Sequence, residues 1–429
     1  PDGMDSLACQ LIAPPAREFN CFFEAGIELP AGGGCGLNAA DRAMSKRLAI
    51  AVFVVTSLFF AAFFVWPIIQ TVRGAFFDVD GRFTADYVIE VFRNPVYVEG
   101  LRNAFLLAVC TTALCMLISL PLAFLADRFQ FPGKPLLTAL VLIPLILPPF
   151  VGAIGVKQIL GQYGALNALL INLGMLADGA TIDWLGQGRF WGVTIMNGLH
   201  LYPILYLNVV AALANIDPAM EEAAENLGCT GLRKFRRITL PLIMPGMFAG
   251  GTIIFIWSFT ELGVPLMFDY NRVTAVQIFH GIKEIGGNPF PYALVAVMLA
   301  ATIALYAASK FLFGRNSHAM MPKATSYGGP RKAPPLMALL CVGAFTLVTL
   351  LATIPRLGVV LISFARDWYQ SVLPESWTLA HYEAALGHGL TVPSIANSLR
   401  YAGMSTALDI LLGIAIAYVV VRTTLPGRQ

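Results

Sequence analysis

The sequence predicts an all-α polytopic membrane protein, and three observations support this fold class. Of its 429 residues, 57% are hydrophobic and only 12% are charged, whereas soluble domains carry about 25% charged residues. Apolar runs of roughly 20 residues, the length of a helix that spans a bilayer, recur along the chain. Lysine and arginine gather in the short connections that follow alternate runs. This much apolar surface requires a lipid bilayer as its solvent.

Eight apolar runs are long enough to form transmembrane helices. Several contain proline, which is tolerated where neighbouring helices satisfy the freed backbone groups. Because basic connections face the cytoplasm, we expect the amino terminus and the basic connection around 233–237 to be cytoplasmic. The runs lie at about 48–71, 103–126, 135–160, 190–215, 238–262, 290–314, 335–363 and 396–421.

The composition argues against several classes of function. A net charge of only +3 gives no reason to expect a nucleic-acid partner. The seven cysteines show neither CxxC nor Cys/His ligand spacing. The sequence contains no Walker A motif and no recognisable nucleophile–base pair. We therefore expect no catalytic residue, no cofactor and no metal site, and we expect the lipid bilayer to be the main surrounding partner.

The chain contains an internal repeat. Residues 103–135 align without a gap with residues 397–429, and both copies begin with Asn and end in Arg-x-x-x-Pro-Gly. Apolar helices resemble each other by chance, but polar matches at fixed positions are more specific. The phrases FTADYVIEVF (83–92) and WTLAHYEAAL (377–386) precede the two copies. We therefore expect a tandem repeat of about six spans whose second copy is incomplete in this sequence.

The repeat divides the chain into segments. We expect a first half at 44–314, a basic cytoplasmic linker at 315–334 and the start of a second half at 335–429. Residues 1–43 lack the basic start and apolar centre of a signal peptide, so we expect a non-native or disordered extension there. The counterparts of everything after Pro135 would lie beyond residue 429. We therefore expect a fragment of a longer protein; the alternative is a natural protein of one and a half repeats.

A charged segment at 217–241 interrupts the apolar runs. Asp217 and Pro218 are typical of a helix start, and Gly228 is typical of a helix end. By periodicity alone the segment fits either a docking helix or an interfacial loop whose residues simply favour helix. The apolar residues of the helix share one face and its glutamates lie elsewhere; they are Met220, Ala223, Ala224 and Leu227 against Glu221, Glu222 and Glu225.

The same segment resembles the EAA signature, EAA-x3-G-x9-I-x-LP, of permease subunits in ABC-type importers. The resemblance implies a type I ABC importer permease fold over about 44–429. It also implies that the segment is a coupling helix that docks in a cleft of an ATPase subunit. Glu222 would make a charged contact, Gly228 would allow the turn, and Leu240–Pro241 would anchor the loop. The matching residues are Glu222, Ala223, Ala224, Gly228, Ile238, Leu240 and Pro241.

Two further phrases are most similar to the fused, two-half permeases of ferric-iron importers: LPPFVGAIGV (147–156) and SFTELGVPLMF (258–268). This resemblance implies a bacterial inner-membrane protein that works with ABC ATPase subunits and a periplasmic substrate-binding protein. Ferric iron is the expected substrate, and 2-aminoethylphosphonate, polyamines, sulfate and thiamine are alternatives. The sequence departs from the pattern because it contains one EAA loop, whereas a complete transporter presents two.

Four polar residues in the apolar runs are candidates for a translocation path. A charge at mid-bilayer costs roughly 2.5–3.5 kcal/mol, so Glu261 should face a cavity or a partner, where it would suit a cationic substrate. The favoured alternative is a carboxylate that reaches water at the outer surface. Asn197, His200 and Tyr202 are weaker candidates, since hydrogen bonds between helices also account for them.

Two other classes of protein stay open. An ion-coupled secondary transporter also uses repeats and broken helices, but it would carry more ionisable residues within its spans and would not need the helix–Gly–helix loop. A membrane scaffold would use the alanine-rich loop as a general docking site.

Overall fold

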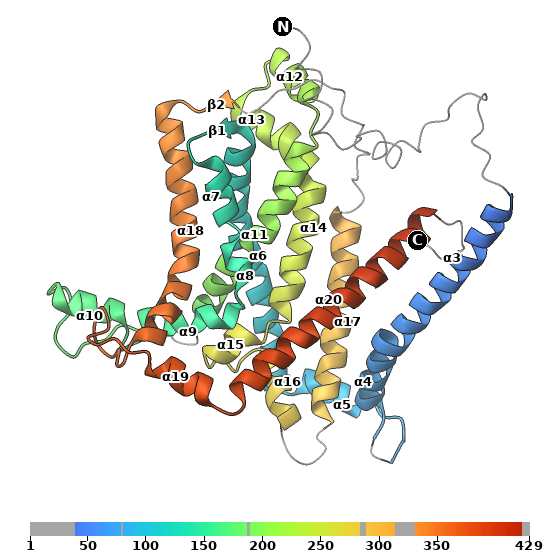
Figure 1. Cartoon of the computed structure of the whole chain (residues 1–429), viewed down its shortest axis with the longest axis horizontal. Helices are drawn as coiled ribbons and strands as arrows, with labels where there is room; N and C mark the ends of the chain where they lie inside the picture. Colours follow the sequence, from blue (N-terminus) through green and yellow to red (C-terminus); the bar gives the residue numbers. More distant parts are fainter. Residues whose placement is uncertain (1–38, 79, 187–188, 284–288, 314–330, 423–429) are drawn as a thin grey trace, which may run out of the picture. The chain divides into compact units, whose positions relative to one another are not determined.

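The computed structural model describes residues 39–78, 80–186, 189–283, 289–313 and 331–422, and most of them are helical (Figure 1). Within these ranges, 7 helices are long and apolar enough to cross a membrane. The fold class predicted from composition is therefore confirmed. The predicted extension lies outside the described residues up to position 38, as does most of the predicted linker. The spans are Ala49–Phe76, Pro95–Arg128, Phe190–Ala214, Gly231–Phe259, Phe290–Phe311, Pro335–Phe364 and Thr391–Val420.

The chain divides into two compact units. Among the described residues, one unit holds 39–61 and 402–422, and the other holds 62–401. The first contains α3 (Ala39–Phe60) and the second part of α20 (Thr391–Arg422). All the sites described below belong to the second unit.

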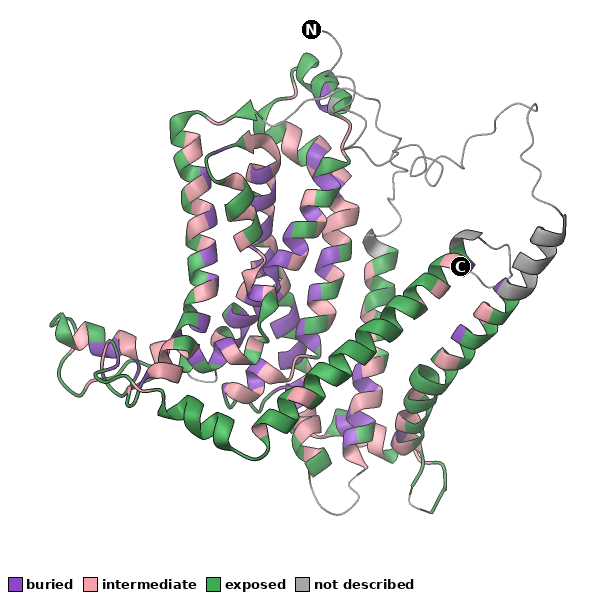
Figure 2. Cartoon of the chain, viewed as in Figure 1, coloured by how far each residue is buried: buried purple, intermediate pink, exposed green. Residues whose placement is uncertain are grey.

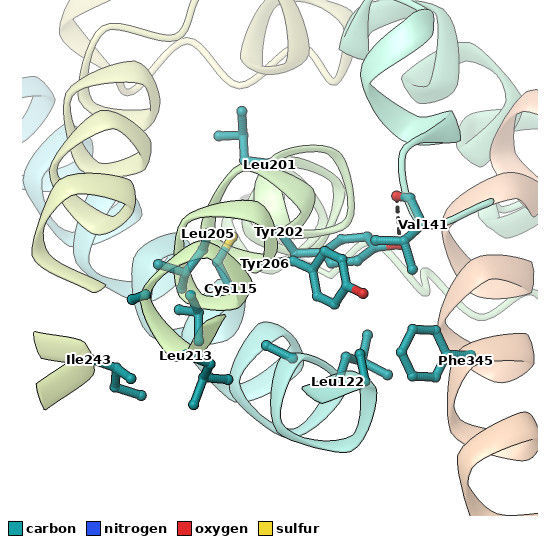
Figure 3. Packing of buried hydrophobic residues seen from close by; sticks show 14 of the residues in the cluster. Cys115, Leu122, Val141, Leu201, Tyr202, Leu205, Tyr206, Leu213, Ile243 and Phe345 are labelled. Carbon is teal, nitrogen blue, oxygen red and sulfur yellow. Dashed lines mark hydrogen bonds between the residues drawn. The ribbon is translucent and has the colours of Figure 1, made fainter. Parts of the chain in front are cut away.

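Four long helices form the main core of the second unit: α6 (Pro95–Arg128), α11 (Phe190–Ala214), α14 (Leu240–Phe259) and α18 (Pro335–Phe364). Figure 3 shows Leu122, Tyr206 and Phe345 converging from α6, α11 and α18. Buried residues concentrate where the helices face one another (Figure 2). Residues of α18, from the predicted second half, thus complete a core built by the first half.

The remaining elements of this unit are short, apart from α17. Both π-helical segments end two residues before a proline, Pro67 or Pro241, which has no N–H to continue the helical ladder. These elements are η1 (Ala61–Val65, shared with the first unit), α4 (Trp66–Phe76), α5 (Asp86–Arg93), β1 (Phe129–Gln130), α7 (Lys134–Leu140), α8 (Ile143–Ile146), α9 (Pro149–Leu160), α10 (Ala165–Asn172), α12 (Pro218–Asn226), α13 (Gly231–Lys234), η2 (Phe235–Thr239), α15 (Gly263–Met267), α16 (Thr274–Lys283), α17 (Phe290–Phe313), β2 (Arg331–Lys332) and α19 (Ala380–Gly387).

The third apolar run is not the single span predicted at 135–160. Its two parts, Lys134–Ile146 and Pro149–Asn172, are bent by 94° at Leu147–Pro148. Pro148 and Pro149 explain the break, because proline removes backbone donors and disfavours helix at the residue before it. Hydropathy gives the length of an apolar run and does not reveal a change of direction within it.

The repeat offset of 294 residues reappears in the helix boundaries. Helix α5 begins at Asp86 and α19 at Ala380, and each first N–H is bound by a threonine hydroxyl, from Thr84 or Thr378. Helices α6 and α20 likewise end at Arg128 and at residue 422. These equivalent starts and ends support the tandem repeat, while the boundaries predicted for the two halves stay predictions.

Helices α9 and α18 meet at glycines. A Cβ atom on Gly155 would lie 1.7 Å from the carbonyl oxygen of Pro355, and one on Gly358 would lie 3.3 Å from the Cα of Gly155. Small residues let helix backbones approach closely in membranes. The broken third run is therefore held tightly against α18.

Candidate functional site

Helix α12 has the ends that its sequence predicts. The Asp217 carboxylate accepts a hydrogen bond of 2.9 Å from the N–H of Ala219, as an N-cap does. Gly228 has φ +75°, and the N–H groups of Gly228 and Cys229 donate to the carbonyls of Glu225 and Ala224. This pair of bonds is a Schellman motif, whose left-handed position favours glycine. The chain turns sharply here before α13.

One side of α12 is anchored to the rest of the unit by Glu221. Its carboxylate is bound by Arg128 at the end of α6 and by the Thr239 hydroxyl at 3.3 Å, and it lies 3.6 Å from Lys234 Nζ. Burial raises the pKa of Glu221, but Arg128 chiefly, together with Lys234 and Thr239, outweighs burial and leaves that pKa below its ordinary value. Local sequence patterns do not single out Glu221, because its partner Arg128 is far away along the chain.

The opposite side of α12 is exposed. Met220 is 50% exposed and Leu227 is 87% exposed, and Glu222 and Ala223 between them are also exposed. Ala224, which was predicted to share the apolar face with Met220 and Leu227, is buried and is therefore not part of the exposed surface. The exposed face therefore includes Met220, Glu222, Ala223 and Leu227, and Ala219 and Asn226 are exposed as well.

The chain passes from α12 into the membrane span through α13 and η2. Ile238 lies in η2 and is half-buried, and Leu240 packs on the main core at the start of α14. Pro241 occupies the first turn of α14 and is exposed. These three residues of the EAA pattern thus connect α12 and α13 to a core helix.

Glu261 lies beyond the end of α14, where it makes local contacts. Its carboxylate accepts hydrogen bonds from the N–H of Gly263 at 2.9 Å, from the N–H of Val264 at 3.3 Å and from the indole of Trp257 at 3.0 Å. Two of these donors are at the start of α15, so Glu261 caps that helix.

The other predicted path residues lie on α11 and are buried. The Tyr202 hydroxyl donates to the carbonyl of Val141 at 3.2 Å (Figure 3), and His200 Nδ1 lies 2.7 Å from the carbonyl of Pro144. Both carbonyls belong to the irregular part of the broken third run, so these side chains satisfy backbone groups that the helix leaves free. Asn197 is buried, and its Nδ2 has no partner among the described residues.

Arg356 on α18 completes this buried cluster, although it was not predicted as a site residue. It is 3% exposed, and its guanidinium donates to Pro144 O at 2.8 Å and lies 3.3 Å from His200 Nδ1. An arginine inside an apolar run is itself a signal of function, and this signal was available in the sequence. The cluster joins α18 to the break in the third run.

Comparison with known proteins gives a consistent assignment. A family model described as "Binding-protein-dependent transport system inner membrane component" matches residues 119–320. A protein of Haloferax volcanii named a probable molybdenum ABC transporter permease is 32% identical over 209 residues, which are 48% of this chain and 73% of that protein. The ferric transport system permease FbpB of Actinobacillus pleuropneumoniae is 26% identical over 88% of this chain. This chain spans 54% of the length of that permease.

The fold also matches a solved structure. A chain of a bacterial alginate ABC transporter, crystallised with an alginate-bound periplasmic protein, aligns with a TM-score of 0.52 and 17% sequence identity. The alignment covers 66% of this chain and 99% of the other. At this identity the match shows the fold alone.

Proposed function

Because this chain belongs to the family of binding-protein-dependent transport system inner membrane components, we propose that it forms the translocation path of an ABC importer and is driven through α12 by separate ATPase subunits. ATP hydrolysis takes place in those subunits, and a periplasmic binding protein delivers the substrate. In this arrangement the end of the bundle that carries α12, α13 and the β1–β2 pair (Figure 1) faces the cytoplasm.

The observation that carries the proposal is the two-sided character of α12. A surface loop with no partner would not need a buried, ion-paired glutamate to hold it in place. Here Glu221 fixes one side through Arg128 and Lys234, while Met220 and Leu227 on the other side leave apolar surface in water. An anchored helix with an exposed apolar face is suited to docking in a groove of another protein.

The anchoring also supplies a route for movement. Glu221 connects α12 to α6 through Arg128, and the chain after α12 runs through α13 and η2 into α14. A displacement of α12 is therefore passed to two helices of the main core at once. Glu222, which is exposed and has no ion pair within the described residues, is free to meet a charged group of the ATPase.

For the substrate we propose ferric iron, on the basis of the ferric transport permease that matches along most of this chain. The molybdenum permease among the relatives supports an oxyanion as a second candidate. Aminoethylphosphonate, polyamines, sulfate and thiamine stay as alternatives within the class.

Capture of the ATPase tests the proposal. The full-length protein is co-expressed with its ATPase subunit, purified in detergent, and compared with Leu227→Asp and Glu222→Ala variants. We expect Leu227→Asp to abolish capture and Glu222→Ala to weaken it, because the first places a charge in the apolar interface. The matched control is Leu336→Asp, at another exposed leucine (79% exposed) outside the 217–241 segment. Full capture by Leu227→Asp would contradict the docking role of α12.

A further inference from the structure

The buried guanidinium of Arg356 has no counter-charge. No carboxylate of the described chain lies within 4.0 Å of it; its guanidinium donates to two backbone carbonyls, Ala352 O and Pro144 O, and lies 3.3 Å from His200 Nδ1. The 2.7 Å separation of His200 Nδ1 and Pro144 O requires a proton on Nδ1, since two acceptors would repel each other. His200 Nδ1 is therefore a donor, like the Arg356 guanidinium beside it. The cluster carries a positive charge and has more hydrogen-bond donors than acceptors.

Further donors without acceptors lie on the same two helices, α18 and α11. Arg356 Nε itself has no partner within the described residues, and neither has the hydroxyl of Thr353, one helical turn away on α18, or Nδ2 of Asn197, one turn from His200 on α11. Buried polar groups are normally hydrogen-bonded, so a group of unsatisfied donors requires an explanation. Acceptor oxygens that arrive with a ligand would satisfy them.

The carboxylate of Glu261, which is linked to His200 through Trp257, is already engaged. Trp257 connects the cluster to Glu261, because its ring lies 6.3 Å from the His200 ring and its indole donates to the Glu261 carboxylate. Two backbone N–H groups of α15 bind that same carboxylate. A role of Glu261 in attracting a cationic substrate stays a prediction, whereas the buried charge of Arg356 favours an anionic one.

The repeat shows that the fold itself does not need this arginine. Helices α4 and α18 end at Phe76 and Phe364, and the carbonyls of these residues accept the N–H of Thr84 and Thr378 at 2.9 and 2.8 Å. Counted back from these equivalent ends, Pro67 corresponds to Pro355, and Ile68 corresponds to Arg356. The first half places an apolar residue where the second half buries a charge.

We propose that Arg356, with the donors around it, recognises an anion in the translocation path, so that the transported solute is an oxyanion or a metal complex with net negative charge. This inference rests on the proposed function, because it takes the path to run between α18 of the second half and α8 and α11 of the first. In the state described here the guanidinium donates a hydrogen bond to Pro144 O. As the halves move, oxygens of the ligand replace this carbonyl as the acceptor. If iron is carried, it crosses as an anionic chelate.

The test is ATP-driven uptake by the complete transporter, with its ATPase subunits and binding protein, in liposomes of phosphatidylcholine and phosphatidylglycerol. The anionic probes are ferric citrate, molybdate, sulfate and 2-aminoethylphosphonate, and the cationic probes are putrescine and the ferric complex of desferrioxamine B. We expect uptake of at least one anionic probe and of neither cationic probe. Uptake of a cationic probe, or ATPase capture without uptake of any anionic probe, overturns the inference while the proposed function stands. Failure of the ATPase to bind overturns both.

Three variants at Arg356 and one control separate charge from structure. Arg356→Lys keeps the charge and should retain most of the uptake, whereas Arg356→Gln keeps donors for Pro144 O but loses the charge and should lower uptake about 10- to 100-fold. Cys341→Ala, which alters another buried α18 side chain far along the helix from Arg356, is the control and should transport normally. Thermal unfolding of each variant checks its fold, and Arg356→Ile, which introduces the side chain of the first repeat, provides a second uncharged variant. Normal uptake by Arg356→Gln would show that Arg356 serves only to hydrogen-bond α18 to Pro144, and it would overturn the inference.

Discussion

Arg128, the last residue of α6, donates a hydrogen bond to the carboxylate of Glu221 in α12. This contact holds α12 against the bundle, and both side chains are at least partly withdrawn from water, with 26% and 11% exposure. Replacing Glu221 with Gln leaves Arg128 and Lys234 without their shared anion. We expect α12 to open more easily by about 1–3 kcal/mol, which gives roughly 10- to 100-fold faster amide exchange in α12. Glu222→Gln is the control and should leave exchange unchanged.

The anchoring of α12 should depend on pH. Because the pKa of folded Glu221 is depressed, its contribution to stability is complete above the ordinary carboxyl pKa of about 4.3 and is lost as the pH falls through the folded-state value. Amide exchange in α12, corrected for intrinsic rates, should therefore be constant from pH 7 to about pH 5 and accelerate below about pH 4. The Glu221→Gln variant should lack most of this acceleration. Identical pH profiles would show that Glu221 is not the titrating anchor.

Gly228 is required for its backbone conformation and not for space. Its φ is +75°, and an added Cβ would meet nothing within 4 Å. Gly228→Ala should therefore destabilise the turn after α12 by about 1 kcal/mol, whereas Gly228→Asn should cost less, since asparagine tolerates this region. Thermal unfolding of the two variants measures the difference. Equal stability of the alanine variant and the wild type would mean that the turn relaxes to another conformation.

Gly155 is required for space. A methyl group at this position would overlap the carbonyl of Pro355, and backbone atoms cannot move aside as a flexible side chain can. We expect Gly155→Ala to separate α9 from α18 and to lower stability by about 1–3 kcal/mol. Gly343→Ala on α18, where nothing lies within 4 Å, is the control and should be neutral or slightly stabilising. The measurement is thermal unfolding in detergent, and equal melting temperatures for the two variants would contradict the close packing.

Much of this fold follows from local sequence signals. Apolar runs identify the spans, and Asp217, Pro218 and Gly228 define α12, because capping and turn preferences act over a few residues. The sequence alone also predicts the repeat. In the structure, Thr84 and Thr378 accept the first N–H of α5 and of α19, at equivalent positions of the two copies.

Other features depend on partners that are distant along the chain. Glu222 stands out by its motif, but it is Glu221 that holds α12, because Arg128 reaches it from another helix. The 94° bend of the third run is hidden because prolines also occur within unbroken spans, as Pro203 does in α11. The contacts of Arg356 could not be predicted, because Pro144 and His200 are distant along the chain and only the fold places them beside it.

Residue-specific crosslinking to the ATPase tests the central claim most directly. Ala223 is exposed and its neighbour Ala224 is buried, so a cysteine at each position probes the two sides of α12 in the same helix. With native Cys229 replaced by Ser, we expect Ala223→Cys to crosslink to the co-purified ATPase subunit through a short bifunctional thiol reagent and Ala224→Cys not to do so. Crosslinking from neither position, with the complex intact, or from Ala224→Cys alone, would contradict docking through the exposed face of α12.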